Sequence, residues 1–447
     1  MANDINEVDK KRVDFIQNSF PKDGLFQGKA WRTTPYPVVL SKKTSKQIHE
    51  LGNYLLHYLR ACNTIYHQSI GGKAPDWIAR YLDAGKPNSI LEQGRHKAFR
   101  NAIPRVIRPD IILGDEEFAI TELDSVPGGI GLTAWLNKTY SSLGDDVIGG
   151  AMGMVEGFTS ILPKGGDILI SEEASDYLPE MEWLIDEIKS SDVNKNYDIL
   201  SAETYKIRDR DIYRFYELFD LNNIPPADDI FNHAANNKIN LTAPHKAYLE
   251  EKMWSALLHS RALRRNWINL MRQSYLDKLQ SYFPYTWIMD PSPVPHYAEL
   301  PGLGINNWNQ LSDFTKTQRE LVLKISGFSE LAWGSRSVKI GHDLSSNHWK
   351  GSVETAISDF PNQPWILQKY KKGKAFEHPY WSEEENKTIS IKVRARLCPY
   401  YFVSSSNESI SDVKLGGILA TLVPADKKII HGMSEAIMAP CIEEKIN

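Results

Sequence analysis

The stretch at residues 108–131, RPDIILGDEEFAITELDSVPGGIG, predicts the part of the fold around which the chain is organised. Residues 111–113 are an apolar run short enough for a buried strand, and the acidic turn at 114–117 interrupts it. A strand pattern resumes at 118–123, and the Pro-Gly-Gly turn at 127–129 ends it. We therefore expect two paired strands joined by a tight turn.

Three carboxylates fall on one face of this predicted hairpin. Glu122 and Asp124 are two residues apart, so both point to the same face, and strand pairing can place Asp110 beside Glu122. Carboxylates in such a set repel one another unless a cation lies between them, and oxygen ligands suit Mg2+ or Mn2+ carrying phosphate rather than zinc. Arg108 adds a planar cation able to bind a phosphate or a carboxylate. The alternative is an acidic hairpin face solvated by water.

The order of these residues resembles the metal-binding signature of the ATP-grasp ligases, which is Arg-x-Asp, an apolar strand, and Glu-x-Asn-x-x-Pro-Gly. This chain has RPD at 108–110 and ELDSVPG at 122–128, so Asp124 replaces the usual Asn. The signature usually lies near the C-terminus, whereas here it lies in the first third of the chain. That order is similar to the circularly permuted ATP-grasp branch related to glutathionylspermidine synthase. The resemblance implies that the nucleotide-binding lobe follows the signature.

A second pattern, ELVLKISGFSELAWGSRSVKIG at residues 320–341, has the order expected of a hairpin that covers a triphosphate. It predicts a strand at 321–323, Lys324 directly after it, a loop of small residues, and a strand at 338–340. Backbone N–H groups and hydroxyls of such a loop can bind phosphate oxygens, while the lysine supplies point charge. The pattern is not a P-loop, and it resembles the lysine strand and glycine loop of ATP-grasp proteins. An ordinary hairpin with an outward lysine is the alternative.

The resemblance implies further nucleotide contacts. The apolar strand at 364–370 would lead into a hinge that binds adenine, Glu377 would meet the ribose, and Lys252 would reach a phosphate. Without the resemblance, Lys252 is an exposed lysine on a long helical segment that begins at Pro244. The candidate residues for ATP are Lys252, Lys324, Ser335, Arg336, Gln368, Lys369, Tyr370 and Glu377.

Residues 391–397, IKVRARL, alternate strictly, so Lys392, Arg394 and Arg396 share one face of a predicted strand. Three cations on one face indicate an anion opposite them. The resemblance implies that Arg394 or Arg396 binds the carboxylate or phosphate and that Arg108 stabilises the oxyanion at the acyl carbon. An exposed edge strand protected by cations is the alternative.

Residues 147–243 alternate strands and helices, which predicts a small doubly wound parallel sheet. Strands are expected at 167–171, 197–202, 212–221 and 239–242, with helices at 176–189 and 228–236, and the glycine-rich run at 149–157 predicts close helix packing. The resemblance implies a pre-ATP-grasp domain that helps to hold the acceptor. We expect its acidic residues to form a solvated helix face, with a mouth that attracts a cationic amine as the alternative. These residues are Glu172, Glu173, Asp176, Glu180 and Glu182.

Length and composition limit the number of domains, the class of partner and the cellular location that we expect. The 447 residues suffice for two or three domains, and the net charge of −4 indicates no nucleic-acid partner. Three widely spaced cysteines without a C-x-x-C motif, and an N-terminus without an apolar signal region, predict a cytoplasmic protein. No apolar run is long enough for a membrane span.

These inferences predict an α/β protein with α+β lobes, namely a circularly permuted ATP-grasp fold with a small doubly wound pre-ATP-grasp domain. The resemblance implies an ATP-dependent carboxylate–amine or carboxylate–thiol ligase that forms an acyl phosphate and uses ATP with Mg2+ or Mn2+. The substrates would be a small-molecule or peptide acid and an amine or thiol. The alternatives are a non-catalytic nucleotide-binding protein and a phosphotransferase on the same fold. The predicted segments are a polar arm (1–30), a metal-binding catalytic lobe (31–146 and 389–447), the pre-ATP-grasp domain (147–243) and a nucleotide-binding lobe (244–388).

Overall fold

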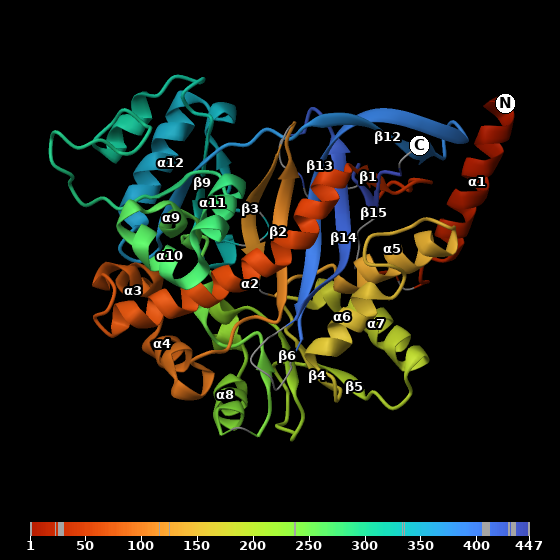
Figure 1. The fold of residues 1–447 in the computed structure, drawn as a ribbon, viewed down its shortest axis with the longest axis horizontal. Helices are drawn as coiled ribbons and strands as arrows, with labels where there is room; N and C mark the ends of the chain where they lie inside the picture. Colours follow the sequence, from red (N-terminus) through yellow and green to blue (C-terminus); the bar gives the residue numbers. More distant parts are fainter. Residues whose placement is uncertain are drawn as a thin grey trace. The chain divides into compact units, whose positions relative to one another are not determined.

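The computed structural model describes residues 2–22, 24–25, 31–115, 117–124, 126–236, 238–332, 334, 336–404, 412–427, 430 and 435–445 (Figure 1). The chain forms two compact units. Unit 1 comprises Met1–Leu56, Ala102–Pro244 and Lys372–Asn447, and unit 2 comprises His57–Asn101 and His245–Lys371. Across the described ranges, none of the helices is both long enough and apolar enough to cross a bilayer. The division of the chain by function stays a prediction.

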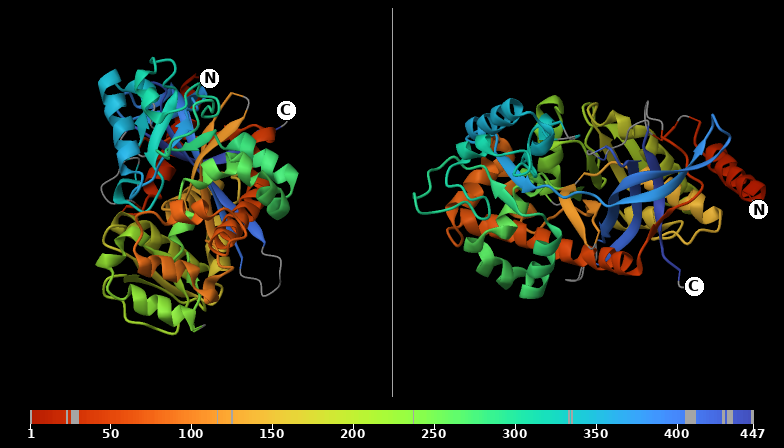
Figure 2. Two further views of the ribbon diagram at one scale, coloured as in Figure 1. Left: turned by 90° about the vertical axis from the view of Figure 1, so that its left-hand side faces the viewer. Right: turned by 90° about the horizontal axis from the view of Figure 1, so that it is seen from above.

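The larger sheet of unit 1 is mostly antiparallel, and both ends of the chain contribute to it. Its strands follow the order β1-β15-β14-β13-β2-β3, and β12 also pairs with β13. The first and last strands pair in parallel, with Val38 opposite Cys441. Strands β13 and β14 lie side by side in each view (Figure 2). The strand bounds are β1 Val38–Leu40, β2 Val106–Leu113, β3 Phe118–Asp124, β12 Ala375–Ser382, β13 Lys387–Val403, β14 Val413–Pro424 and β15 Ile437–Glu443.

The hairpin predicted from the signature is confirmed. Strands β2 and β3 pair antiparallel, Asp110 lies opposite Glu122, and the register shifts directly after Asp110. The long strand β13 lies between β14 and β2, so its cations are not on an edge strand. The edge-strand alternative for Arg394 and Arg396 is therefore wrong.

The second sheet of unit 1 is parallel, as the alternating pattern predicted. Its order is β5-β4-β6-β7, with β4 at Gly166–Ile170, β5 at Tyr197–Ser201, β6 at Ile212–Phe215 and β7 at Leu241–Thr242. The strand expected at 212–221 is too long, because a 3-10 helix, η3 (Leu218–Asn223), takes over its second half. The helices of this region are α5 Ile130–Ser142, α6 Gly153–Ile161, α7 Leu178–Ser191 and α8 Ala227–Ala235.

One apolar core joins the two sheets of unit 1. Side chains from β13, from β4 and from helices α5, α6 and α7 belong to the same buried cluster. The predicted close packing of the glycine-rich run is confirmed, because a Cβ on Gly153 would lie 2.5 Å from the carbonyl oxygen of Gly416. Burial of this apolar surface is the main stabilising term for the unit.

Unit 2 has a four-stranded antiparallel sheet in the order β10-β9-β11-β8. Its strands are β8 Thr286–Ile288, β9 Leu321–Ile325, β10 Lys339–Ile340 and β11 Trp365–Lys369. Alternate residues of β9, Leu321, Leu323 and Ile325, face a core that includes Trp349 of α12 (Ser346–Asp359). Lys324 therefore lies on the opposite face of the sheet.

The long helix expected from Pro244 onward is wrong, since this segment consists of several short helices. Arg272 adopts a left-handed φ of 75° between α10 and α11, which ends one helix before the next begins. The apolar side chains Leu249, Met253 and Leu257, which are spaced four residues apart, are nevertheless buried. The helical elements are η4 Ala247–Glu250, α9 Trp254–His259, η5 Arg261–Leu263, α10 Arg264–Met271 and α11 Gln273–Tyr282. Unit 2 also contains the α-helices α3 Asp76–Asp83 and α4 Asn88–Arg95 and the 3-10 helices η1 Lys97–Phe99, η6 Trp308–Asp313, η7 Glu330–Ala332 and η8 Gly341–Asp343.

Two helices precede the signature hairpin. Residues 1–30 were expected to be a polar arm, but Ala2–Asn18 form helix α1, because Val13 and Ile16 recur at helical spacing and are buried. The helix α2 (Lys42–Ile70) contains the boundary between the two units.

Candidate functional site

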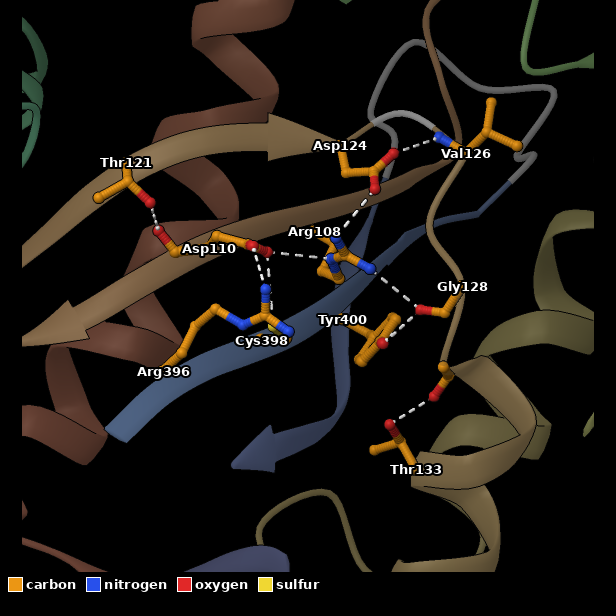
Figure 3. A network of polar contacts seen from close by, with 11 residues as sticks. Arg108, Asp110, Thr121, Asp124, Val126, Gly128, Thr133, Arg396, Cys398 and Tyr400 are labelled. Carbon is orange, nitrogen blue, oxygen red and sulfur yellow. Dashed lines mark hydrogen bonds and ion pairs between the residues drawn. The ribbon is translucent and has the colours of Figure 1, made fainter. Parts of the chain in front are cut away.

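An arginine–carboxylate network occupies one face of the larger sheet in unit 1 (Figure 3). Arg108 Nε lies 3.2 Å from Asp110 Oδ1, and Arg108 Nη2 lies 2.9 Å from Asp124 Oδ2. Arg396 of β13 donates to the other Asp110 oxygen at 3.2 Å, and Cys398 Sγ contacts Oδ1 at 3.4 Å. Four of the predicted catalytic and metal-binding residues, Arg108, Asp110, Asp124 and Arg396, are thus brought together, since antiparallel pairing places β2 between β3 and β13. Arg394 Nη1 instead donates to the Lys427 carbonyl at 3.3 Å.

Mutual charge neutralisation holds this network in its ionised form. Burial opposes the charge of Arg108, but the carboxylates of Asp110 and Asp124 raise its pKa well above the usual value. Burial likewise favours the neutral form of Asp110, yet Arg108 and Arg396 hold its pKa below the usual value. Asp110 is therefore a charged acceptor that fixes two guanidinium groups.

Asp124 differs from Asp110 in its electrostatic environment. Burial raises the pKa of Asp124, Arg108 opposes this effect, and the neighbouring charges of Asp110 and Glu122 raise the pKa further. The three acids thus interact, and Glu122 is half-buried. A divalent cation would relieve this excess of negative charge, so the oxygen chemistry of the set fits Mg2+. Within the described ranges, however, no three acidic, histidine or cysteine residues form a group ready to hold a metal ion, and the metal site stays a prediction.

Orphaned polar atoms extend this face beyond the carboxylates. The Nε atoms of Arg394 and Arg396 and the Oγ1 atom of Thr421 are buried and have no hydrogen-bond partner in the described part of the chain. Thr421 of β14 pairs directly with Arg396. A buried donor without an acceptor is costly, so such a cluster is suited to a bound anion.

The Pro-Gly-Gly turn after β3 is fixed from both sides. Gly129 has a φ of 86°, and a Cβ on Gly131 would lie 1.9 Å from the Glu180 carbonyl oxygen. Arg108 Nη1 and the Tyr400 hydroxyl both donate to the carbonyl of Gly128, at 3.1 and 2.7 Å. The signature glycines are needed for close backbone approach to neighbouring groups.

Glu180 was expected on an acidic surface, and that expectation is wrong. Its side chain is fully buried and accepts hydrogen bonds from the backbone N–H groups of Gly129 (2.6 Å) and Leu132 (2.9 Å). It therefore caps the N-terminus of α5, where the helix dipole favours a negative charge. Burial raises the pKa of Glu180 to about 7, although these N–H groups oppose the shift.

The raised pKa of Glu180 predicts a specific pH dependence of stability. The folded protein holds this proton more tightly than the unfolded chain, so the free energy of unfolding should fall as pH rises from about 4.5 to 7, by up to about 3 kcal/mol. Glu180→Gln should remove this fall, whereas Glu182→Gln, at an exposed position of the same helix, should retain it. Urea unfolding at several pH values tests this difference. Identical pH slopes for the wild type and Glu180→Gln would contradict it.

The predicted lysine hairpin is present in unit 2. Strands β9 and β10 pair antiparallel, with Leu323 opposite Lys339. Lys324 does not follow the strand, because it is the fourth residue of β9 and pairs with Ile366 of β11. Its side chain is only 5% exposed, so the alternative of an outward, solvated lysine is wrong.

The other candidates for the nucleotide lie on several elements. In unit 2, Gln368 is buried and donates to Thr286 at 3.1 Å, Lys369 is exposed, and the half-buried Tyr370 packs edge-on against His342. Lys252 Nζ donates to the carbonyl of Ala332 in the β9–β10 loop at 3.0 Å. Three further candidates complete the set: Arg336 is exposed in the same loop, Ser335 lies outside the described residues, and Glu377 is exposed on β12 of unit 1.

Sequence reasoning missed several residues that order these two regions. They are Glu180 in unit 1 and the buried pair Lys86 and Glu251 in unit 2. None of them belongs to a local motif, since each contacts groups far away in the sequence.

Comparisons with known proteins give a likeness of fold. No protein-family model matches the chain, and no curated protein matches its sequence. A solved glutathione synthetase-like effector, GSS30, from Globodera pallida has a TM-score of 0.58 and 10% identity, covering 99% of this chain and 97% of the effector. A protein assigned as a gamma-glutamylcysteine synthetase from Methylobacillus flagellatus KT has a TM-score of 0.39 and 12% identity, covering 78% of this chain and 81% of that protein.

The effector shares the fold of this chain over nearly its whole length, and at this identity the likeness concerns the fold alone. The second similarity is too low to support an argument. The ATP-grasp assignment expected from the signature therefore stays a prediction. The circular permutation and the pre-ATP-grasp domain stay predictions.

Proposed function

We propose that this protein is an ATP-dependent ligase that joins a carboxylate to an amine or a thiol through an acyl phosphate, releasing ADP and phosphate. The observation that carries the proposal is the buried network of Arg108, Asp110, Asp124 and Arg396, which lies on one face of a sheet and contains unsatisfied donors. Its sequence resembles the ATP-grasp signature, and its fold resembles a glutathione synthetase-like protein.

The acid substrate would bind at the orphaned donors of this network. Arg394 and Arg396 would hold its carboxylate, or later the leaving phosphate, by charge-assisted hydrogen bonds. Arg108, already oriented by two carboxylates and the Gly128 carbonyl, would stabilise the oxyanion at the acyl carbon. Fixed donors of this kind need no reorganisation during the reaction.

Most of the residues proposed for the nucleotide lie on unit 2. Lys324, Lys252 and Arg336 would bind the phosphate chain, together with the backbone and the Ser335 hydroxyl of the β9–β10 loop. Gln368, Lys369 and Tyr370 would meet the adenine, and Glu377 would meet the ribose. The burial of Lys324 supports its role, because a cation held in a low-dielectric site interacts more strongly with phosphate.

The cation would be Mg2+ or Mn2+, and Glu122, Asp124 and Asp110 would hold it. When bound, it supplies positive charge that neutralises the phosphate oxygens. The protein groups would orient the carboxylate and the phosphate chain and exclude water from the acyl phosphate, as positioning dominates phosphoryl transfer.

The acceptor would bind beside the parallel sheet of unit 1. In this sheet β5 lies on one side of β4, and β6 and β7 lie on the other, so the strand order reverses at β4. In open parallel sheets, ligands bind at the carboxyl ends of the strands beside such a reversal. Glu172 and Glu173 follow β4, and Glu217 follows β6. Tyr177 also follows β4, and a Cβ on Gly128 of the turn after β3 would lie 2.1 Å from its ring, so this edge lies close to the arginine network. An acidic edge of this kind favours a cationic amine.

The test is ADP production from Mg2+–ATP across a panel of acids, each with and without amine or thiol acceptors. A ligase should release ADP only when an acid is present and should form an amide or a thioester. ATP binding without acid-dependent ADP release would instead indicate a non-catalytic nucleotide-binding protein, and a stable phosphorylated product would indicate a phosphotransferase. Hydrogen exchange should also slow at residues 108–128 and at 321–340 when Mg2+–ATP binds.

A further inference from the structure

A buried ion pair in unit 2 links the β9–β10 loop to two other segments. Lys86 Nζ contacts Glu251 Oε1, and both side chains are only 1% exposed. The second Glu251 oxygen accepts a hydrogen bond from the hydroxyl of Ser326, the first residue after β9. The Glu251 carboxylate, directly after η4, thus binds Lys86 in the turn after α3 and Ser326 at the start of the β9–β10 loop.

The start of the loop fits closely against Glu251. A Cβ on Gly327 would lie 2.9 Å from the Glu251 carboxyl carbon, so a side chain there would displace this carboxylate. The backbone N–H groups after Glu251 add two hydrogen bonds to Ser326, from Lys252 to its carbonyl (2.8 Å) and from Met253 to its hydroxyl (2.9 Å). Residues 251–253 therefore fix the position of Ser326 from one side.

Other hydrogen bonds hold the rest of the described loop, among them Ser337 N–H to the Leu331 carbonyl (3.0 Å) and Gln363 to the Gly327 carbonyl (2.9 Å). Lys252 Nζ reaches the Ala332 carbonyl at 3.0 Å, and the Ile325 N–H donates to Ser337 at 3.2 Å. Gly334 and Arg336 at the tip are exposed. The loop is thus anchored at its base, while its tip faces solvent.

The two lysines assigned above to the phosphates flank this anchor. Lys252 is adjacent to Glu251, and Lys324 lies two residues before Ser326. A buried ion pair is a poor stabiliser, because the cost of desolvation offsets most of the attraction. A buried carboxylate, unlike an apolar side chain, fixes the orientation of the groups that donate hydrogen bonds to it. The pair is therefore better explained by positioning than by stability.

We propose that Glu251, held by Lys86, is a positioning residue that sets the base of the β9–β10 loop and the two flanking lysines for binding the phosphate chain of the nucleotide. This inference rests on the proposed function of the hairpin. Glu251 touches neither substrate nor cofactor in this assignment, and it acts through Ser326, Gly327 and Lys252.

The experiment compares Glu251→Gln with the double variant Lys86→Met/Glu251→Leu. The single variant leaves a buried lysine without its counter-charge, whereas the double variant removes both charges and should recover much of the lost thermal stability. Both should raise the KM for ATP about tenfold while kcat changes less than about threefold, because an interaction made equally in ground and transition states is lost. If the double variant regains thermal stability but keeps the raised KM for ATP, the effect of Glu251 on ATP binding is due to positioning and not to a folding defect.

Asn63→Ala provides the matched control. Asn63 is a buried polar residue of the same unit that accepts hydrogen bonds from Lys246 (2.7 Å) and Tyr248 (2.8 Å). It should lower the melting temperature but leave the KM for ATP within about twofold. A wild-type KM in the double variant, or an equal rise in KM in the control, would overturn the inference.

A second readout separates this inference from the proposed function. Amide exchange at residues 326–332 should become at least about tenfold faster in Glu251→Gln without any nucleotide, which corresponds to a local loss of protection. If the wild-type protein neither binds nor hydrolyses ATP, the proposed function fails regardless of this result. Unchanged exchange in Glu251→Gln would overturn the inference even in an active ligase.

Discussion

Replacing Lys324 by methionine is expected to reduce ADP production by about 10²–10³-fold while the protein stays folded. Lys324 is buried in β9 between paired strands, on the face opposite the apolar core of unit 2. Methionine keeps most of the aliphatic stem and removes the charge that the phosphate chain would need. Steady-state ADP release measures the effect, and urea unfolding checks the fold.

Lys339→Met is the matched control for this prediction. Lys339 is half-buried on β10 of the same hairpin, and it has no assigned role in binding phosphate. Its ADP production should stay within about threefold of the wild type. If Lys324→Met retained a third of the wild-type activity, the assignment of the lysine strand would have to be abandoned.

Replacing Glu122 by glutamine is expected to reduce turnover by about 10²–10³-fold, because the substitution removes one negative charge from the three carboxylates without changing the shape of the side chain. Glu122 lies opposite Asp110 and is half-buried, so the substitution should leave the pairing of β2 and β3 intact. Two measurements test it: ADP production as a function of Mg2+ concentration, and calorimetric titration of Mg2+ in the presence of ATP. The second should show weakened binding of the cation.

Glu117→Gln controls for a general loss of negative charge from the same hairpin. Glu117 is an exposed residue of the turn between β2 and β3, and its replacement should change turnover less than about twofold. Wild-type turnover in Glu122→Gln would leave the acidic residues as a solvated hairpin face and remove the metal assignment.

The local features of unit 1 could be predicted from sequence because they repeat with a fixed period. Alternation placed Glu122 and Asp124 on one face. The turn at 114–117 set the register as far as Ile111, opposite Ile120, and a register shift that no sequence pattern marks then puts Asp110 opposite Glu122. Strands alternating with helices predicted the parallel sheet. The glycine-rich run at 149–157 predicted close packing because a side chain there would meet neighbouring backbone.

Features that depend on distant partners could not be predicted. Glu180 resembles its exposed neighbours in sequence, and only the approach of α5 shows that it caps a helix. Lys86 and Glu251 are 165 residues apart, and no local pattern joins them. The broken helices after Pro244 were also missed, since one apolar stripe fits both a long helix and several short ones.

The pairing of β1 with β15 has a consequence for biosynthesis. The strand β15 inserts between β14 and β1, so this sheet stays incomplete until residues 437–443 have left the ribosome. Contacts between segments this far apart in the sequence form late, since a long intervening polypeptide must first be ordered. Deleting β15 should therefore trap a chain that exposes the side of β14 that β15 normally covers, which invites aggregation.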